Sequence, residues 1–256
     1  APSGVSITHD DNPNSDPLSA GTWTGGVMTV SVALKSKRGA WSVPGASAET
    51  TISAGGAGTP GVYNSQSVRV QANGASTTKN LLLRLPGETL FPGSPTGKTA
   101  AVPIEQEAGS TFTATVYAAD QFFNPYEPLQ AQTPAVWLEG GTSYAQTGTT
   151  VTLALGSTTF ALYLPVASTT TLISAKTLTA PFVNNSTRVS VSPARQLSGA
   201  WRLQRLIPNM RPAPGSLTGC RNSVPAMTVG ATATVRINLV DAFYNTVYGT
   251  TTWIGA

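Results

Sequence analysis

The chain has 256 residues, of which 40% are hydrophobic and 10% charged, and its formal net charge is +4. Soluble globular chains carry about 25% charged residues, and Thr, Ser, Gly and Pro replace the missing charge here, which favours strands and tight turns over helices. Because it has no basic stripe, no second cysteine and no apolar run of ~18 residues, the composition argues against nucleic-acid binding, a disulfide scaffold and membrane insertion.

Residues 1–20 form an N-terminal extension that contains the densest acidic cluster of the chain. Side-chain oxygens follow one another closely in HDDNPNSDP, at Asp10, Asp11, Asn12, Asn14 and Asp16. Calcium takes such hard oxygen ligands, but Pro13 interrupts the run and no Glu follows at the distance that an EF-hand needs. We therefore expect a solvated tail, with a calcium site as the alternative.

Short strand patterns fill the rest of the chain. Apolar and polar residues alternate in VMTVSVAL (27–34), SVRVQA (67–72), TFTATVYA (111–118), TVTLAL (150–155), FALYLP (160–165) and TATVRINLVD (232–241). Since successive side chains of a strand point to opposite faces, each segment predicts a strand with one buried face. Gly, Pro, Ser or Asn bound each segment, and helical periodicity is almost absent. The predicted fold class is all-β.

The strands belong to a sequence that repeats itself about every 121 residues. Residues 44–54 match residues 165–175, and GSTFTATVYAADQFFN at 109–124 matches GATATVRINLVDAFYN at 230–245. Self-similarity at a fixed long period indicates an array of like modules. Trp23, Trp137 and Trp253 recur at a similar spacing and are interpreted as the openings of successive units.

About seven short strands per unit predict two tandem immunoglobulin-like β-sandwich domains. Their predicted bounds are residues 21–134 and residues 135–250. Residues 251–256 then either start a further repeat or form an exchanged terminal strand.

Two Pro-rich segments stand at the same place in both units, at residues 85–103 and 207–225. Because Pro has no N–H to donate to a sheet, these segments predict extended loops or crossovers at a sheet edge. Cys220 in the second segment stands opposite Lys98 in the first, so the fold does not require a cysteine at this position.

The fullest motif that both units share is a strand ending in an acid, two aromatic positions and an amide. It runs from Asp120 to Asn124 in the first unit and from Asp241 to Asn245 in the second. Side chains of Asp and Asn bond nearby backbone amides and tolerate turn conformations, so the motif predicts a structural turn after the strand. The alternative is an inter-module calcium ion held by Asp120 or Asp241 together with loop carbonyls.

This strand and Asp-x-x-x-Asn turn resemble the bacterial immunoglobulin-like repeats that occur in tandem in adhesins, invasin-type proteins and other surface proteins. The resemblance covers both units and is strongest around the two turns. It implies an extracellular location at the cell surface and an immunoglobulin-like sandwich for each unit. It does not imply a particular ligand.

No group of residues predicts an enzyme or a cofactor other than calcium. His9 is the only histidine and has no counterpart in the second unit, and no paired carboxylates recur between the units. Asn184 and Asn185 begin two overlapping acceptor sequences for N-glycosylation in NNST.

The sequence thus predicts a structural subunit of an extracellular filament, stalk or adhesin shaft. Such a subunit would associate with itself into a homopolymer through sandwich packing and strand exchange. One alternative is an adhesin or carbohydrate-binding module that binds a host or surface glycan through Trp41, Tyr126, Tyr144 or Trp201. A surface-layer lattice protein is the other alternative.

Overall fold

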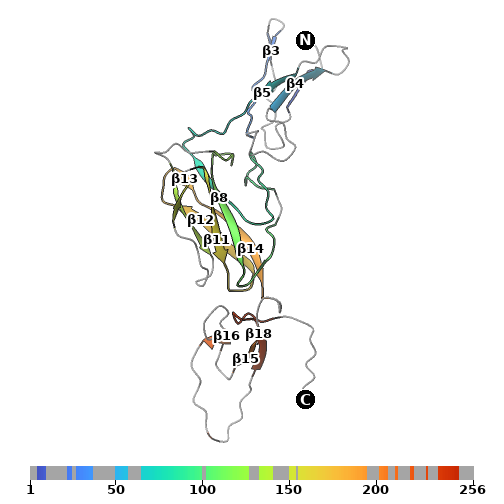
Figure 1. The fold of residues 1–256 in the computed structure, drawn as a ribbon. Coiled ribbons are helices and arrows are strands. Elements are labelled where there is room, and N and C mark those ends of the chain that lie inside the picture. The colour runs from blue at the N-terminus through green and yellow to red at the C-terminus, as the bar shows by residue number, and fades with distance from the viewer. Residues whose placement is uncertain are drawn as a thin grey trace.

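A computed structural model of the chain contains strands and, among the residues that it describes, no helix, which confirms the all-β prediction. Among the described residues there is thus no helix that is long and apolar enough to cross a bilayer. The structure describes residues 5–9, 22–24, 27–36, 50–56, 65–99, 102–126, 133–140, 150–153, 155–194, 202–206, 211–212, 220–221, 229 and 236–247. These residues form a central sandwich with smaller groups of strands on either side of it (Figure 1).

The central sandwich consists of a five-stranded and a four-stranded sheet. The larger sheet has the order β10-β9-β12-β14-β7, formed by β10 (Val151–Thr152), β9 (Ala135–Gly140), β12 (Ser168–Thr177), β14 (Asn185–Ser192) and β7 (Gln106–Glu107). The smaller sheet has the order β11-β8-β6-β13, formed by β11 (Ser157–Tyr163), β8 (Thr111–Ala119), β6 (Lys79–Arg84) and β13 (Phe182–Val183). Only the pairs β13–β6 and β14–β7 are parallel within these sheets.

One hydrophobic core fills the space between the two sheets. Alternation along β8 places Phe112, Ala114 and Val116 inside and the intervening threonines towards the surface. Leu81 and Leu83 of the smaller sheet, with Ile173, Val189 and Leu138 of the larger one, are at most 1% exposed and belong to the same cluster. Full burial of a side chain of this size contributes about 1.5–3 kcal/mol, so the core fixes how the sheets face each other.

The Pro-rich segment after β6 is a loop that packs on the outer face of the smaller sheet. Leu90 in this loop lies with Phe123 on Leu82 and Tyr117 of the sheet. The loop has no regular strand between residues 85 and 99, where Leu90 and Lys98 make an isolated bridge. Sheet residues that face away from the main core are thereby covered as well.

A buried ion pair holds this loop to the sandwich. Lys98 Nζ lies 2.7 Å from Glu88 Oε1 and donates a hydrogen bond to the carbonyl of Leu83 at 2.9 Å. Glu88 Oε2 accepts from the N–H of Leu85 at 2.7 Å. The sequence pattern did not reveal this pair.

Further strands precede and follow the sandwich in the sequence. On the N-terminal side, β1 (Val5–His9), β4 (Thr50–Gly56) and β5 (Ser65–Val68) form a sheet, and β2 (Thr22–Thr24) pairs with β3 (Val27–Thr29). On the C-terminal side, β15 (Arg202–Leu206) pairs with β18 (Arg236–Val240), and β16 (Arg211–Pro212) pairs with β17 (Cys220–Arg221). All of these pairs are antiparallel.

The central sandwich runs across residues 134 and 135, where the sequence pattern placed a boundary between two units. Its strands β6, β7 and β8 precede that point, whereas β9 to β14 follow it, and both groups share one core. A repeat fixes the length of a module but does not fix where the module begins. Trp23 and Trp137 recur at a similar spacing but do not occupy equivalent places, because Trp23 lies in a hairpin with β3 whereas Trp137 lies in β9, which pairs with β12.

Candidate functional site

The two Asp-x-x-x-Asn turns lie directly after equivalent strands, β8 and β18. All four side chains are buried, with exposed fractions of 1% at Asp120, 2% at Asn124, 1% at Asp241 and 1% at Asn245. Charged and amide groups are seldom buried unless their hydrogen bonds are satisfied, so these turns are the strongest candidates for a functional site.

In the first turn, the carboxylate of Asp120 organises the backbone. Its Oδ1 accepts hydrogen bonds from the N–H groups of Phe122 at 2.8 Å and Asn124 at 2.9 Å. Phe123 between them has a φ of 58°, in the left-handed region. This conformation costs a bulky residue on the order of 1–3 kcal/mol, which the carboxylate bonds offset.

The second turn has the same geometry. Asp241 Oδ1 accepts from the N–H groups of Phe243 at 2.8 Å and Asn245 at 2.9 Å, and Tyr244 has a φ of 64°. The two turns share the Asp, two aromatic positions and the Asn, and the Asp and Asn side chains make the repeated bonds.

Each turn also binds main-chain atoms of a preceding part of the chain. The first turn meets residues on the N-terminal side of the central sandwich, and this contact is called the N-terminal junction. There, Asn124 Nδ2 donates to the carbonyl of Lys35 at 2.8 Å. The N–H of Asn73 donates to Asp120 Oδ2 at 2.9 Å. The first turn therefore ties the central sandwich to residues on its N-terminal side.

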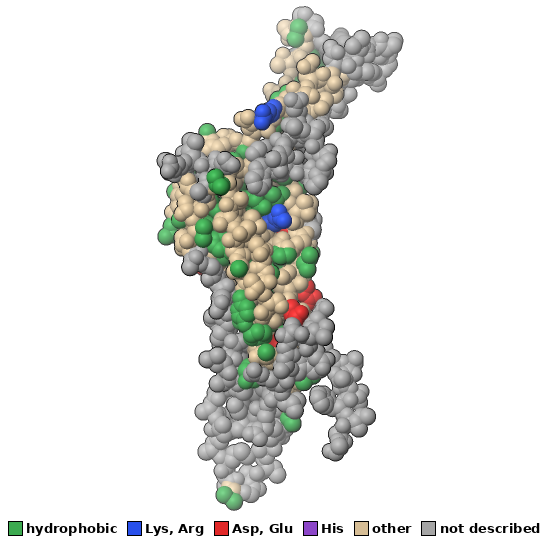
Figure 2. Space-filling model, viewed as in Figure 1, with side chains coloured by type: hydrophobic (Ala, Val, Ile, Leu, Met, Phe, Trp, Pro, Cys, Tyr) green, Lys and Arg blue, Asp and Glu red, His purple; other side chains and the backbone are tan. Residues whose placement is uncertain are grey.

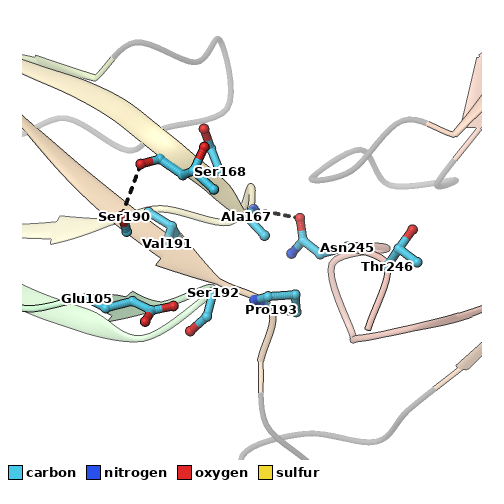
Figure 3. A pocket seen from close by; sticks show the side chains of 10 residues that line it. Glu105, Ala167, Ser168, Ser190, Val191, Ser192, Pro193, Asn245 and Thr246 are labelled. Atoms are coloured by element: carbon cyan, nitrogen blue, oxygen red, sulfur yellow. Dashed lines mark hydrogen bonds between the residues drawn. The ribbon is translucent and has the colours of Figure 1, made fainter. Parts of the chain in front are cut away.

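The C-terminal junction repeats this arrangement between the Asp241 turn and the central sandwich. Asn245 Nδ2 donates to the carbonyl of Pro165 at 2.8 Å, and the N–H of Ala194 donates to Asp241 Oδ2 at 2.8 Å. Asn245 Oδ1 also accepts from the N–H of Ala167 at 2.7 Å (Figure 3). The carboxylate and the amide of the turn are thus both bonded to the end of the sandwich.

An aromatic ring packs into the C-terminal junction. Phe243 meets Tyr163 edge to face, with ring centroids 5.8 Å apart and an interplanar angle of 77°. The ring occupies the space where a Cβ on Gly109 would lie, and Gly109 has a φ of +79°. The N-terminal junction differs, because Phe122 there lies under Lys35 Nζ at 5.7 Å.

The oxygen atoms of the turn carboxylates are already occupied by hydrogen bonds, so they do not fit the role of calcium ligands. Asp241 accepts four hydrogen bonds, from the N–H groups of Phe243, Asn245 and Ala194 and from Asn245 Nδ2. A carboxylate has about four lone-pair positions, so none is left to ligate a cation. In the described part of the chain, no three His, Cys, Asp or Glu side chains form a group that could hold a metal. The candidate ligands Asp10 to Asp16 lie outside the described residues.

A hollow of about 500 Å³ opens between the sandwich and the second turn (Figure 3). Its lining is formed by Glu105, Ala167, Ser168, Thr169, Ser190, Val191, Ser192, Pro193, Asn245 and Thr246. Half of these side chains bear a hydroxyl, and Glu105 is the single charged member of the described lining. The hollow runs along the C-terminal junction and has a mixed polar and apolar lining.

The two glycosylation candidates lie at the start of β14. Asn184 is exposed, and its Oδ1 accepts from the N–H of Thr177 at 2.9 Å. Asn185 is half-buried, and its Oδ1 accepts from the N–H of Leu83 at 3.1 Å, which links the larger sheet to the smaller one. Asn184 is therefore the more accessible acceptor.

Among the aromatic residues considered for glycan binding, only Tyr126 is described, and Trp41, Tyr144 and Trp201 lie outside the described residues. The Tyr126 ring packs against the main core, and Lys79 Nζ lies 5.8 Å from its centroid. Burial, with a smaller contribution from the Asp120 charge, raises the pKa of Tyr126 to about 12. The ring belongs to the packing beside the first turn and is no open platform.

Sequence patterns found the four turn side chains but missed their partners. Lys35, Asn73, Pro165, Ala167 and Ala194 all act through main-chain atoms, so their side-chain types carry no signal. One signal was present: Asn73 and Ala194 stand at the repeat offset of 121, as do the two aspartates that they bond.

No protein-family model matches the chain, and no curated protein matches it. Among solved structures, that of the surface layer protein SbsC, domains 4–9, is similar to the chain at 16% sequence identity and a TM-score of 0.29. The match covers 96% of this chain and 37% of that one, so the chain spans little more than a third of its length.

Proposed function

We propose that the chain is a structural part of an extracellular cell-surface filament, stalk or adhesin shaft built from tandem immunoglobulin-like sandwiches. The observation that carries the proposal is the bonded turn that recurs at both junctions. Each turn connects its own module to the preceding one through a buried carboxylate and a buried amide.

Such junctions make an array stiff. A bend at the C-terminal junction would have to break the bonds that Asn245 makes to Pro165 and Ala167 and the bond from Ala194 to Asp241. A hydrogen bond to a neutral group contributes about 0.5–1.5 kcal/mol, and one to a charged group about 1.5–3 kcal/mol. Stiff joints between small domains serve reach and display, as a stalk or shaft requires.

The surface of the molecule suits packing against copies of itself. Among the described residues on the face in Figure 2, Lys, Arg, Asp and Glu side chains are few, in line with the 10% charged residues of the sequence. Such a face meets little charge repulsion when identical molecules approach.

Electron microscopy of the native cell surface, with gold-labelled antibody against the chain, tests the proposal. We expect label along filaments or stalks outside the cell. Label confined to the cell interior would refute it, and label on a regular two-dimensional lattice would instead support a surface-layer role. A glycan array probed with the purified chain tests the carbohydrate-binding alternative.

A further inference from the structure

The edge of β6 that faces away from β8 is bonded in part by side chains. β13 pairs with the first two residues of β6, and the chain then passes into β14 of the larger sheet. Further along β6, the N–H of Leu83 donates to Asn185 Oδ1 at 3.1 Å, and its carbonyl accepts from Lys98 Nζ at 2.9 Å. Side chains from β14 and from the Pro-rich loop after β6 therefore meet at one residue of this edge.

This arrangement brings an amine and an amide next to each other. In a hydrogen-bonded pair of antiparallel strands, one facing residue supplies both the acceptor for an N–H and the donor for a C=O. Asn185 Oδ1 and Lys98 Nζ take these two places opposite Leu83. The N and O atoms of one residue are less than about 4 Å apart by standard bond lengths, so the two side chains end at adjacent positions of the same edge.

A buried carboxylate lies beside the amine. Glu88 Oε1 is 2.7 Å from Lys98 Nζ, and it also accepts from Thr187 Oγ1 at 3.2 Å, two residues after Asn185 in β14. The side chains of Lys98 and Glu88 are 9% and 4% exposed. An amine, an amide and a carboxylate that can carry a proton between them are therefore gathered beside the hydrophobic core.

The buried ion pair supplies a driving force for chemistry between these groups. Two charges taken out of water carry a desolvation penalty that can exceed their mutual attraction. If the amine becomes part of an amide while the carboxylate takes up a proton, two neutral groups replace the two charges. The fold itself does not require a lysine at this position, because Cys220 stands opposite Lys98 in the second Pro-rich segment.

From this geometry we infer that Lys98 and Asn185 form an intramolecular amide cross-link, with Glu88 as the proton carrier. Nζ of Lys98 bonds to Cγ of Asn185, the bond between Cγ and Nδ2 breaks, and ammonia leaves. Of the three protons on the Lys98 ammonium, one stays on Glu88, one moves by way of Glu88 to the leaving Nδ2, and one remains on the new amide. The reaction needs no oxidant, cofactor or further reactant.

The surroundings of the amide favour this attack. Negative charge develops on Oδ1 of Asn185 as the amine adds to Cγ, and the N–H of Leu83 already donates to that atom. The neighbouring Glu88 carboxylate activates the amine by taking its proton. Because folding brings the three groups together, the reaction is intramolecular and takes place only in the folded chain.

The cross-link ties the Pro-rich loop covalently to β14. The loop directly follows β6 of the smaller sheet, whereas β14 belongs to the larger sheet, so the cross-link limits how far the two sheets can separate when the chain is stretched. It also consumes the side-chain amide of Asn185, which leaves Asn184 as the glycosylation acceptor. The inference stands on the geometry of these side chains and does not depend on the proposed function.

Mass spectrometry of the 256-residue chain, folded without glycosylation and then denatured, tests the inference. We expect a mass lower than that of the sequence by one ammonia. Fragmentation of a proteolytic digest should show one branched peptide that joins the stretch around Lys98 to the stretch around Asn185. A chain with the full mass of its sequence would overturn the inference, and so would a lost ammonia that maps to a cyclised Asn and not to a branched peptide.

Variants assign the roles of the three groups. Lys98→Arg keeps a cation beside Glu88 but removes the reactive amine, so it should have its full sequence mass, and a lost ammonia in this variant would overturn the inference. Glu88→Gln should slow cross-linking by about 100-fold or more, and an unchanged rate would refute the proton-carrier role. Asn184→Ala is the matched control for Asn185→Ala, because the Asn184 side chain is exposed, and only Asn185→Ala should retain its full mass. The branched peptide of the wild-type chain decides the inference even where a variant fails to fold.

Discussion

Replacing Asn245 by Ala tests whether the second turn fastens the C-terminal junction. The change removes three hydrogen bonds, to the carbonyl of Pro165, from the N–H of Ala167 and to the carboxylate of Asp241. The two neutral bonds contribute about 1–3 kcal/mol together and the charged one about 1.5–3 kcal/mol. Because water can enter the space left by the amide, we expect a loss of about 3 kcal/mol at the junction.

Amide hydrogen exchange at Ala167 measures this loss locally. Its N–H is donated to Asn245 Oδ1 at 2.7 Å, so Asn245→Ala should speed its exchange about 100-fold, the factor that corresponds to about 3 kcal/mol. Asn184→Ala is the matched control, because that side chain is exposed and lies away from the junction. Unchanged protection at Ala167 in the Asn245→Ala variant would refute the assignment of the turn as a fastening.

Four further outcomes are expected. Gly109→Ala should lower the free energy of unfolding by more than about 1 kcal/mol, because the φ of Gly109 is +79° and an aromatic ring fills its Cβ position. A variant that unfolds at the same urea concentration as the wild type would contradict this. Lys98→Met should cost about 3–5 kcal/mol in the same assay by leaving the Glu88 carboxylate buried and unpaired, and adding Glu88→Leu should restore part of the loss. Tyr126 should ionise near pH 12, as measured by the absorbance of tyrosinate. Because the folded chain holds the phenolic proton more tightly than the unfolded chain does, the contribution of Tyr126 to stability is complete below about pH 10 and is lost as the pH rises towards 12. A calcium chelator should leave the amide protection of Ala194 unchanged, and faster exchange would reveal a cation at the turn.

The strands that sequence patterns located best are those that find their neighbours within the described sandwich. The alternation over 111–118 predicts a strand, and this segment lies within β8, which is paired on both sides. The segment 27–34 has the same alternation, yet only Val27–Thr29 is a strand. Alternation records which face a side chain takes, whereas strand formation also requires a neighbour to bond.

Hydrogen bonds between residues close in sequence can also be predicted from the sequence, whereas bonds between distant segments cannot. Asp120 and Asn124 stand four residues apart, and their mutual bonds follow from that spacing. The acceptor at Lys35 is a carbonyl 89 residues away in the chain, which every residue possesses. The ion pair between Lys98 and Glu88 joins two points of one irregular loop, for which no periodic pattern exists.

Main-chain recognition at the junctions bears on how such an array could lengthen over evolutionary time. The carbonyls of Lys35 and Pro165 perform the same task although one side chain is a cation and the other a ring. A newly duplicated module that carries the Asp and Asn could therefore make these main-chain bonds to any predecessor whose backbone has the right shape, whichever side chains stand at the two carbonyl positions. Modules could be added, lost or reordered while the surfaces that face the environment diverge.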